Sequence, residues 1–175
     1  MLFRSEYSKK LDQAPYKPKG MVLGTTPRVL SLSSGSGDAA RGPVYWAWVE
    51  DDGRVLENGQ FENLSRDDRS RDEFAELVQR RKPDVIGVGG FSIETNKMIK
   101  DIRDLVSERD LRGPDFDVRE TNETHNEQLE VVVVNEEVAR LYRDSPRALG
   151  DYPGLSSITR YCVALAKIEE RRVGK

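Results

Sequence analysis

The chain has little cysteine, little histidine and no long apolar run, and each shortage excludes a class of protein. Its single cysteine, Cys162, excludes an internal disulfide and is typical of a reducing compartment. Its single histidine, His125, lies in a polar stretch without cysteine partners, which argues against a zinc site. No segment approaches the about 20 apolar residues of a membrane span, and the N-terminus lacks a signal peptide's apolar core. We therefore expect a soluble intracellular domain in which Cys162 is buried apolar filler.

An excess of charge of one sign is also missing. The chain has 28 basic and 31 acidic side chains, a formal net charge of −3, so no overall field draws it to nucleic acid. Basic residues do gather between positions 66 and 82, but aspartates are interleaved with them, and a solvated helix face is the default interpretation. Within this cluster Arg80, Arg81 and Lys82 are the candidates for an interaction surface.

The length of the chain and the distribution of its proline and glycine predict one domain preceded by an arm. A length of 175 residues is enough for a single domain with its own core. Residues 1–27 carry scattered proline and glycine without a sustained period, which predicts an extended N-terminal arm or linker. We assign the globular domain to residues 28–172 and a short C-terminal tail to residues 173–175.

The hydrophobic period predicts three strands in a meander, followed by strands that alternate with helices. The predicted strands are Val29–Leu32, Val44–Val49, Val55–Phe61, 85–90 and Val131–Val134. The order β-β-β-α-β-α-β-α-α indicates an α/β fold. It predicts a mixed five-stranded sheet, an antiparallel meander plus parallel strands, with helices on both faces.

Local signals place the helix ends. Ser70 and Glu73 form a capping box that predicts the start of the first helix. A second amphipathic helix begins between Ser92 and Thr95, and Gly113-Pro114 is expected to end it. The polar stretch that follows is predicted as a loop with one short strand around Phe116–Val118. The last helix has Leu155, Ile158, Cys162, Leu165 and Ala166 on one face.

Two further patterns are candidate sites with ordinary structural explanations. Trp46 and Trp48 alternate along a strand, so both face one side of the sheet. Core or partner-facing packing is the favoured interpretation, and an exposed pair would be an interaction patch. Glu136 and Glu137 follow a strand and open a helix, where negative charge is stabilising and Asn135 can serve as the cap. The turn Ser33–Gly37 is interpreted as a plain strand end, because no lysine follows as in a phosphate-binding loop.

A longer block of sequence carries a family resemblance. Residues 132–148, with Asp151-Tyr152-Pro153, form its most specific part, and Tyr161–Lys167 and Pro27–Ser33 are consistent with it. The block resembles the YqgF domain, a ribonuclease H-like domain of the eukaryotic transcription elongation factor and histone chaperone suppressor of Ty six. It is more distantly similar to the bacterial protein Tex.

The resemblance implies a nuclease frame without its catalyst. In nuclease relatives this fold holds two metal ions with carboxylates on the first strand, at the end of the fourth, and on or before the last helix. The matching positions here are Ser33, Gly90 and Glu136, only one of which is a carboxylate. The expectation is therefore no enzyme, no catalytic residue, no metal and no cofactor. A displaced site built from Asp38, Glu94 and Glu136 remains an alternative.

The resemblance also implies a biological role. It predicts a non-catalytic scaffold or interaction domain of a nuclear elongation factor and histone chaperone, with RNA polymerase II and histones as partners of the full-length protein and no membrane. Two alternatives stay open at this point. One is a metal-dependent, resolvase-like nuclease, and the other is a non-catalytic module that binds nucleic acid.

Overall fold

The computed structural model describes residues 27–34, 42–89, 93–118 and 123–173. Two positions named above, Asp38 and Gly90, lie outside the described residues. So do almost all of the predicted N-terminal arm, most of the Ser33–Gly37 turn, and residues 174–175 of the predicted tail.

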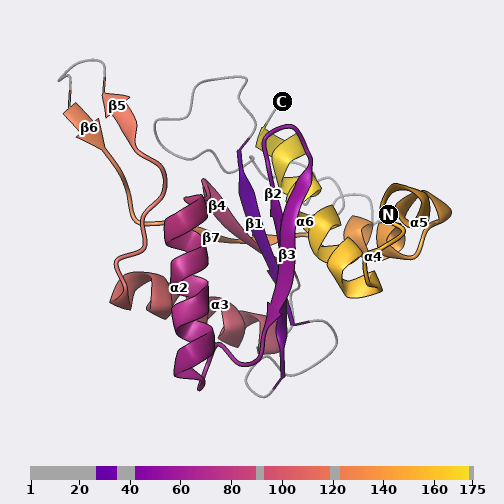
Figure 1. The fold of residues 1–175 in the computed structure, drawn as a ribbon, viewed down its shortest axis with the longest axis horizontal. Coiled ribbons are helices and arrows are strands. Elements are labelled where there is room, and N and C mark those ends of the chain that lie inside the picture. The colour runs from indigo at the N-terminus through magenta and orange to yellow at the C-terminus, as the bar shows by residue number, and fades with distance from the viewer. Residues whose placement is uncertain (1–26, 35–41, 90–92, 119–122, 174–175) are drawn as a thin grey trace, which may run out of the picture.

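A five-stranded sheet forms the centre of the molecule, with strand order β3-β2-β1-β4-β7 (Figure 1). Its strands are β1 (Val29–Ser33), β2 (Val44–Val49), β3 (Val55–Phe61), β4 (Val85–Gly89) and β7 (Val131–Val134). Antiparallel pairing joins β1 to β2 and β2 to β3, whereas β1, β4 and β7 run parallel to one another. The predicted meander and parallel strands are confirmed. Among the parallel strands, β4 and β7 are rich in valine and isoleucine, as expected where helices cover both faces of a sheet.

Helices cover both faces of this sheet, as predicted (Figure 1). One face packs against α2 (Asp68–Arg81) and α3 (Ile93–Glu108). The other packs against α6 (Ser157–Val173), which α4 (Glu137–Arg143) and the short α5 (Pro146–Asp151) accompany. Within the described residues no helix is both long enough and apolar enough to cross a bilayer.

The predicted helix ends need two corrections. The first helix begins at Asp68, not at a Ser70 cap, because Asp67 precedes it and accepts hydrogen bonds from the Ser70 amide and hydroxyl at 3.0 and 2.6 Å. Ser70 is instead buried in the first turn. The second helix ends at Glu108, before Gly113, because Asp110 turns into the left-handed conformation with φ of 47°.

The loop after α3 contains a two-stranded hairpin rather than one short strand. β5 (Phe116–Val118) lies where a strand was expected, and it pairs antiparallel with β6 (Glu123–His125). The second strand escaped prediction because its residues are polar and fully exposed, so no burial pattern marks it.

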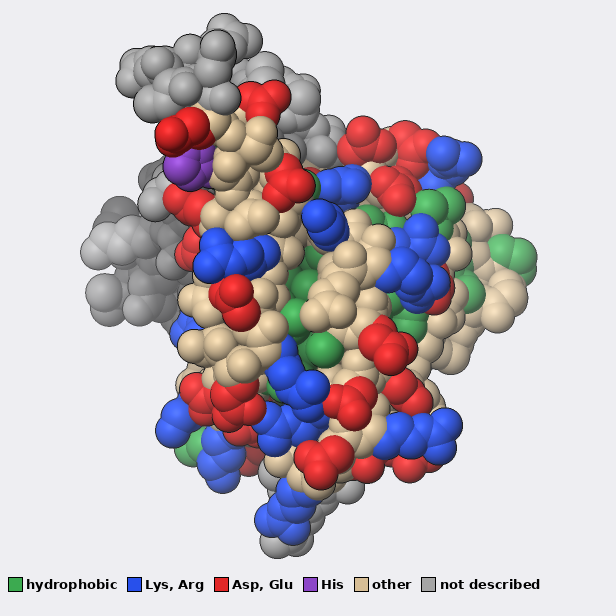
Figure 2. Space-filling model, turned by 60° about the vertical axis from the view of Figure 1, so that its left-hand side comes forward, with side chains coloured by type: hydrophobic (Ala, Val, Ile, Leu, Met, Phe, Trp, Pro, Cys, Tyr) green, Lys and Arg blue, Asp and Glu red, His purple; other side chains and the backbone are tan. Residues whose placement is uncertain are grey.

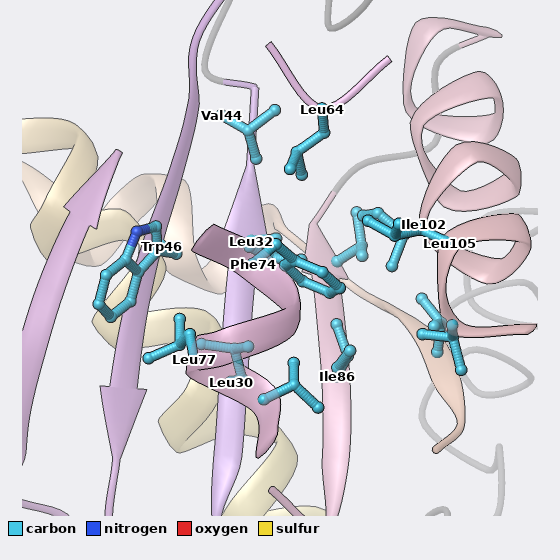
Figure 3. Packing of buried hydrophobic residues seen from close by; sticks show 14 of the residues in the cluster. Leu30, Leu32, Val44, Trp46, Leu64, Phe74, Leu77, Ile86, Ile102 and Leu105 are labelled. Carbon is cyan, nitrogen blue, oxygen red and sulfur yellow. The ribbon is translucent and has the colours of Figure 1, made fainter. Parts of the chain in front are cut away.

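Side-chain alternation divides the core into two layers. On β1, Leu30 and Leu32 face α2 and α3, where they join a large apolar cluster with Trp46, Phe74 and Ile86 (Figure 3). The intervening Ser31 faces α6 and lies 2.6 Å from the Cys162 carbonyl, to which its hydroxyl donates. Cys162 itself is fully buried, which confirms its prediction as core filler, and burial raises the pKa of its thiol.

Candidate functional site

The carboxyl ends of three parallel strands meet at one edge of the sheet, beneath α6. The register pairs Leu32 with Val88 and Gly89 with Val134. Ser33 and Gly89 therefore stand on neighbouring strands, and Glu136 follows β7 two residues after its end. The structure thus brings together two predicted positions, Ser33 and Glu136, while Gly90 lies outside the described residues.

Tyr161 of α6 occupies the space in front of Gly89. A Cβ atom built on Gly89 would lie 2.5 Å from a Leu165 methyl carbon and 2.7 Å from the Tyr161 hydroxyl, both closer than real contacts allow. Tyr161 is only 3% exposed, and Ser33, on the strand next to Gly89, is equally buried. A side chain larger than hydrogen fits at position 89 only if the side chains of Leu165 and Tyr161 shift.

Glu136 is held by two partners. The Tyr161 hydroxyl donates to one carboxylate oxygen at 2.5 Å, and Arg140, one helical turn along α4, pairs with the other at 2.5 Å. Burial and the hydrogen bond to this carboxylate raise the pKa of the Tyr161 phenol, which therefore stays protonated as the donor. The Arg143 guanidinium lies 6.0 Å from the centre of the Tyr161 ring and adds a second positive charge nearby.

This arrangement holds α4 against α6. Both oxygens of Glu136 already have partners, and the adjacent Arg140 charge would repel a metal ion. Among the described residues no three metal-binding side chains converge. Glu94 of the alternative site lies in the first turn of α3, whose buried residues belong to the cluster on the other face of the sheet.

The remaining predicted site residues are placed as follows. Trp46 and Trp48 do share a face, but they are 8% and 1% exposed, so they form no exposed patch. Arg80 and Arg81 both pair with Glu57 of β3, and Lys82 lies 3.7 Å from Asp115. On the face that Figure 2 draws, basic and acidic side chains are intermixed, without a broad area of one sign.

Two smaller expectations concern polar loops. His125 is exposed in the β5–β6 hairpin, and its Nε2 lies 3.2 Å from Glu123. Asn135 accepts a hydrogen bond from the Glu137 amide at 3.0 Å, although the residue at the cap position itself is Glu136. Sequence reasoning missed Tyr161 as a site residue. Its position on the buried stripe of a helix marks it only as core.

Comparison with known proteins identifies the family. Residues 23–171 match the model of the YqgF family described as Holliday-junction resolvase-like of SPT6. Transcription elongation factor SPT6 of Gibberella zeae is 65% identical over 94% of this chain, and that of Schizosaccharomyces pombe is 36% identical over 95%. The chain spans only 12% and 11% of the length of these two relatives.

Among solved structures the chain is similar to RuvC of Thermus thermophilus. The complex with a Holliday junction substrate has a TM-score of 0.53 at 10% identity, covering 83% of this chain and 93% of that one. A second RuvC structure has a TM-score of 0.51 at 11% identity, covering 85% and 97%. At this identity the likeness shows the fold, which is ribonuclease H-like. With the family match, it follows that the chain belongs to the YqgF family, Holliday-junction resolvase-like of SPT6.

Proposed function

We propose that this chain is a non-catalytic interaction domain of a nuclear transcription elongation factor and histone chaperone. The family and the names of the relatives support the elongation role. Because the chain is a small part of those relatives' length, RNA polymerase II and histones are proposed as partners of the whole protein. The domain would contribute a rigid frame and a surface for protein contacts.

One observation carries the non-catalytic part of the proposal. The place where a nuclease of this fold would need converging carboxylates is occupied by the Tyr161 side chain, whose hydroxyl lies against Gly89, and Ser33 lies on the neighbouring strand. The one carboxylate there, Glu136, is neutralised by Arg140 and accepts from Tyr161. A metal ion could enter only after these contacts were broken.

A nuclease assay tests this part. The chain is incubated with Mn²⁺ or Mg²⁺ and a four-way DNA junction, single-stranded DNA or single-stranded RNA, with T. thermophilus RuvC as the active control. We expect no cleavage above the buffer blank and no heat of Mn²⁺ binding by calorimetry. Cleavage by the wild-type chain that disappears in Glu136→Gln would overturn the proposal, because it would show that this carboxylate works in a metal site.

The interaction part needs a separate test. Purified core histones and purified RNA polymerase II elongation complexes are each titrated against the chain, and binding is measured by sedimentation. Binding to either is the expected result. A chain that binds neither would contradict the interaction role and leave the non-catalytic part unaffected.

A further inference from the structure

A pocket of about 150 Å³ lies between α4, α5 and α6, which pack together beside the sheet (Figure 1). We call it the α4–α6 pocket. None of Ser33, Gly89, Glu136 and Tyr161 contributes to its lining, so it has no part in the site described above. Its lining comes from seven residues of the three helices: Val138, Tyr142, Arg147, Asp151, Ala164, Lys167 and Ile168.

The inner wall of the pocket is apolar. Val138 of α4 supplies one side, and Ala164 and Ile168 supply the other, four residues apart on one face of α6. Ala164 is buried, and its small side chain leaves the space in front of it open. An apolar space of about 150 Å³ is large enough for one benzene-sized ring. The pocket therefore suits a single side chain of the size of phenylalanine or leucine.

The apolar wall continues outside the pocket along α4. Val138 is 62% exposed, and Leu141, three residues further on, is 79% exposed. Residues three apart on a helix are neighbours on its surface, so the two side chains form one strip. Neither is buried by the fold of the described residues. An apolar strip that leads into a pocket with a few polar groups is typical of a surface that binds another molecule.

The charge left over at the pocket is positive. Two of its three charged lining residues are cations. Arg147 lies 3.8 Å from Asp151, which also accepts a hydrogen bond from the Tyr142 hydroxyl at 2.9 Å. Lys167 pairs with no carboxylate among the described residues, and its ammonium lies 5.0 Å from the centre of the Tyr152 ring. The ring holds this amine beside the pocket without neutralising its charge, so a ligand's carboxylate would be favoured there.

We propose that the α4–α6 pocket binds a protein segment in which a large apolar side chain stands next to aspartate or glutamate. The apolar side chain fills the pocket, and the neighbouring carboxylate pairs with Lys167. An acidic segment is favoured over nucleic acid, because the strip of Val138 and Leu141 offers phosphates no donor. This inference rests on the proposed interaction function and names the surface and the partner's chemistry.

Peptide titration followed by NMR tests the inference. Acetylated and amidated nine-residue peptides of serine carry phenylalanine at the centre, with glutamate or glutamine on either side of it. A third peptide has alanine between the glutamates. We expect amide shifts of the full chain to be concentrated in α4, α5 and α6. The glutamate peptide with phenylalanine should bind about fivefold tighter than its glutamine counterpart and about tenfold tighter than the alanine peptide.

Two variants separate the charge from the apolar wall. Lys167→Gln should bring the glutamate and glutamine peptides within about twofold of each other. Val138→Ser, at an exposed position, should weaken both phenylalanine peptides about threefold and leave the preference for glutamate unchanged. Lys100→Gln is the matched control, because Lys100 is an exposed lysine of α3, on the other face of the sheet. It should leave every dissociation constant within about twofold.

Shifts centred elsewhere on the chain, equal affinity for the glutamate and glutamine peptides, or equal effects of the two lysine variants would overturn the inference. So would displacement of the peptide by an oligothymidine, or a dimer of this chain that Val138→Ser dissociates. Absence of peptide binding, with histones or elongation complexes still bound by the chain, would overturn this surface and leave the proposed interaction function standing.

Discussion

The face of the sheet under α2 and α3 is built almost wholly from apolar side chains, whereas the face under α6 contains buried hydroxyl and phenol groups and the half-buried carboxylate of Glu136. On the first face Phe61 lies between Trp46 and Phe74, with ring centres 5.8 Å apart on each side. On the second face, the Ser31 hydroxyl lies within hydrogen-bond distance of the Ala47 and Cys162 carbonyl oxygens. The Tyr161 hydroxyl donates to the Glu136 carboxylate.

This difference shows that the two faces of the sheet constrain the sequence in different ways. The apolar face needs only volume and shape, which many sequences supply. The α6 face must satisfy polar groups one by one, so a change at one position constrains the others. Here Gly89 makes room for Tyr161, and Tyr161 in turn supplies the donor that Glu136 accepts from. The four predictions below test this contrast.

The largest loss of stability is expected on the apolar face. Phe74 is fully buried and meets Phe61 edge to face. Phe74→Ala should lower the free energy of unfolding by about 3–5 kcal/mol, because it leaves a cavity in a close-packed cluster. Urea denaturation measures it. Leu56→Ala, at a side chain 46% exposed, should change stability by less than about 0.5 kcal/mol. Similar losses in both variants would contradict the layered core.

A carboxylate placed on the α6 face should destabilise rather than restore a metal site. Gly89→Asp forces a side chain against Tyr161 and Leu165 and sets a second carboxylate near Glu136. We expect a loss of about 2–3 kcal/mol, from overpacking and from burial of an unpaired charge. Mn²⁺ titration during thermal unfolding is the check. A variant of wild-type stability that Mn²⁺ stabilises further would show that the nuclease geometry is still available.

The same two faces explain what sequence alone could predict. The strands were predictable because short apolar runs such as Val131–Val134 and Val44–Val49 indicate a buried strand from neighbouring residues alone. The contact between Tyr161 and Glu136 was not, since it joins residues 25 positions apart and depends on where α6 lies across the sheet. Glu136 was identified as the remaining carboxylate, but its partners came only from the structure.

The tryptophans show the same limit at shorter range. Their alternation correctly predicted a shared face. It could not predict that Trp48 would find an acceptor in Glu50 while Trp46 would lie over Gly59 with no acceptor among the described residues. Residue identity fixes which groups need partners, and tertiary packing decides which of them obtain one.

A third prediction concerns the phenol of Tyr161. Tyr161→Phe removes the donor to Glu136 and should cost about 1–2 kcal/mol at neutral pH. The raised pKa of Tyr161 contributes stability that is complete below the ordinary tyrosine value of 10 and is lost as pH rises above it towards the folded-state value. The variant should therefore lose less stability between about pH 9 and 11 than the wild type.

Tyr142 is the control for this pH dependence. Its pKa is also raised, to about 12, by burial and by its hydrogen bond to Asp151. Tyr142→Phe removes only the pH-dependent stability that comes from the raised pKa of Tyr142, at a more exposed site than Tyr161. A Tyr161→Phe variant with the same alkaline slope as the wild type would mean that the phenol is not linked to folding.

The smallest effect separates two chemically identical changes. Both Trp46→Phe and Trp48→Phe shrink a buried ring, but only the second breaks a hydrogen bond, to Glu50. Trp48→Phe should therefore be more destabilising by about 1 kcal/mol, because the first variant also removes an unsatisfied donor. Urea denaturation of the free chain measures the difference. If Trp46→Phe proves equally costly, its indole N–H already has a partner in the free protein.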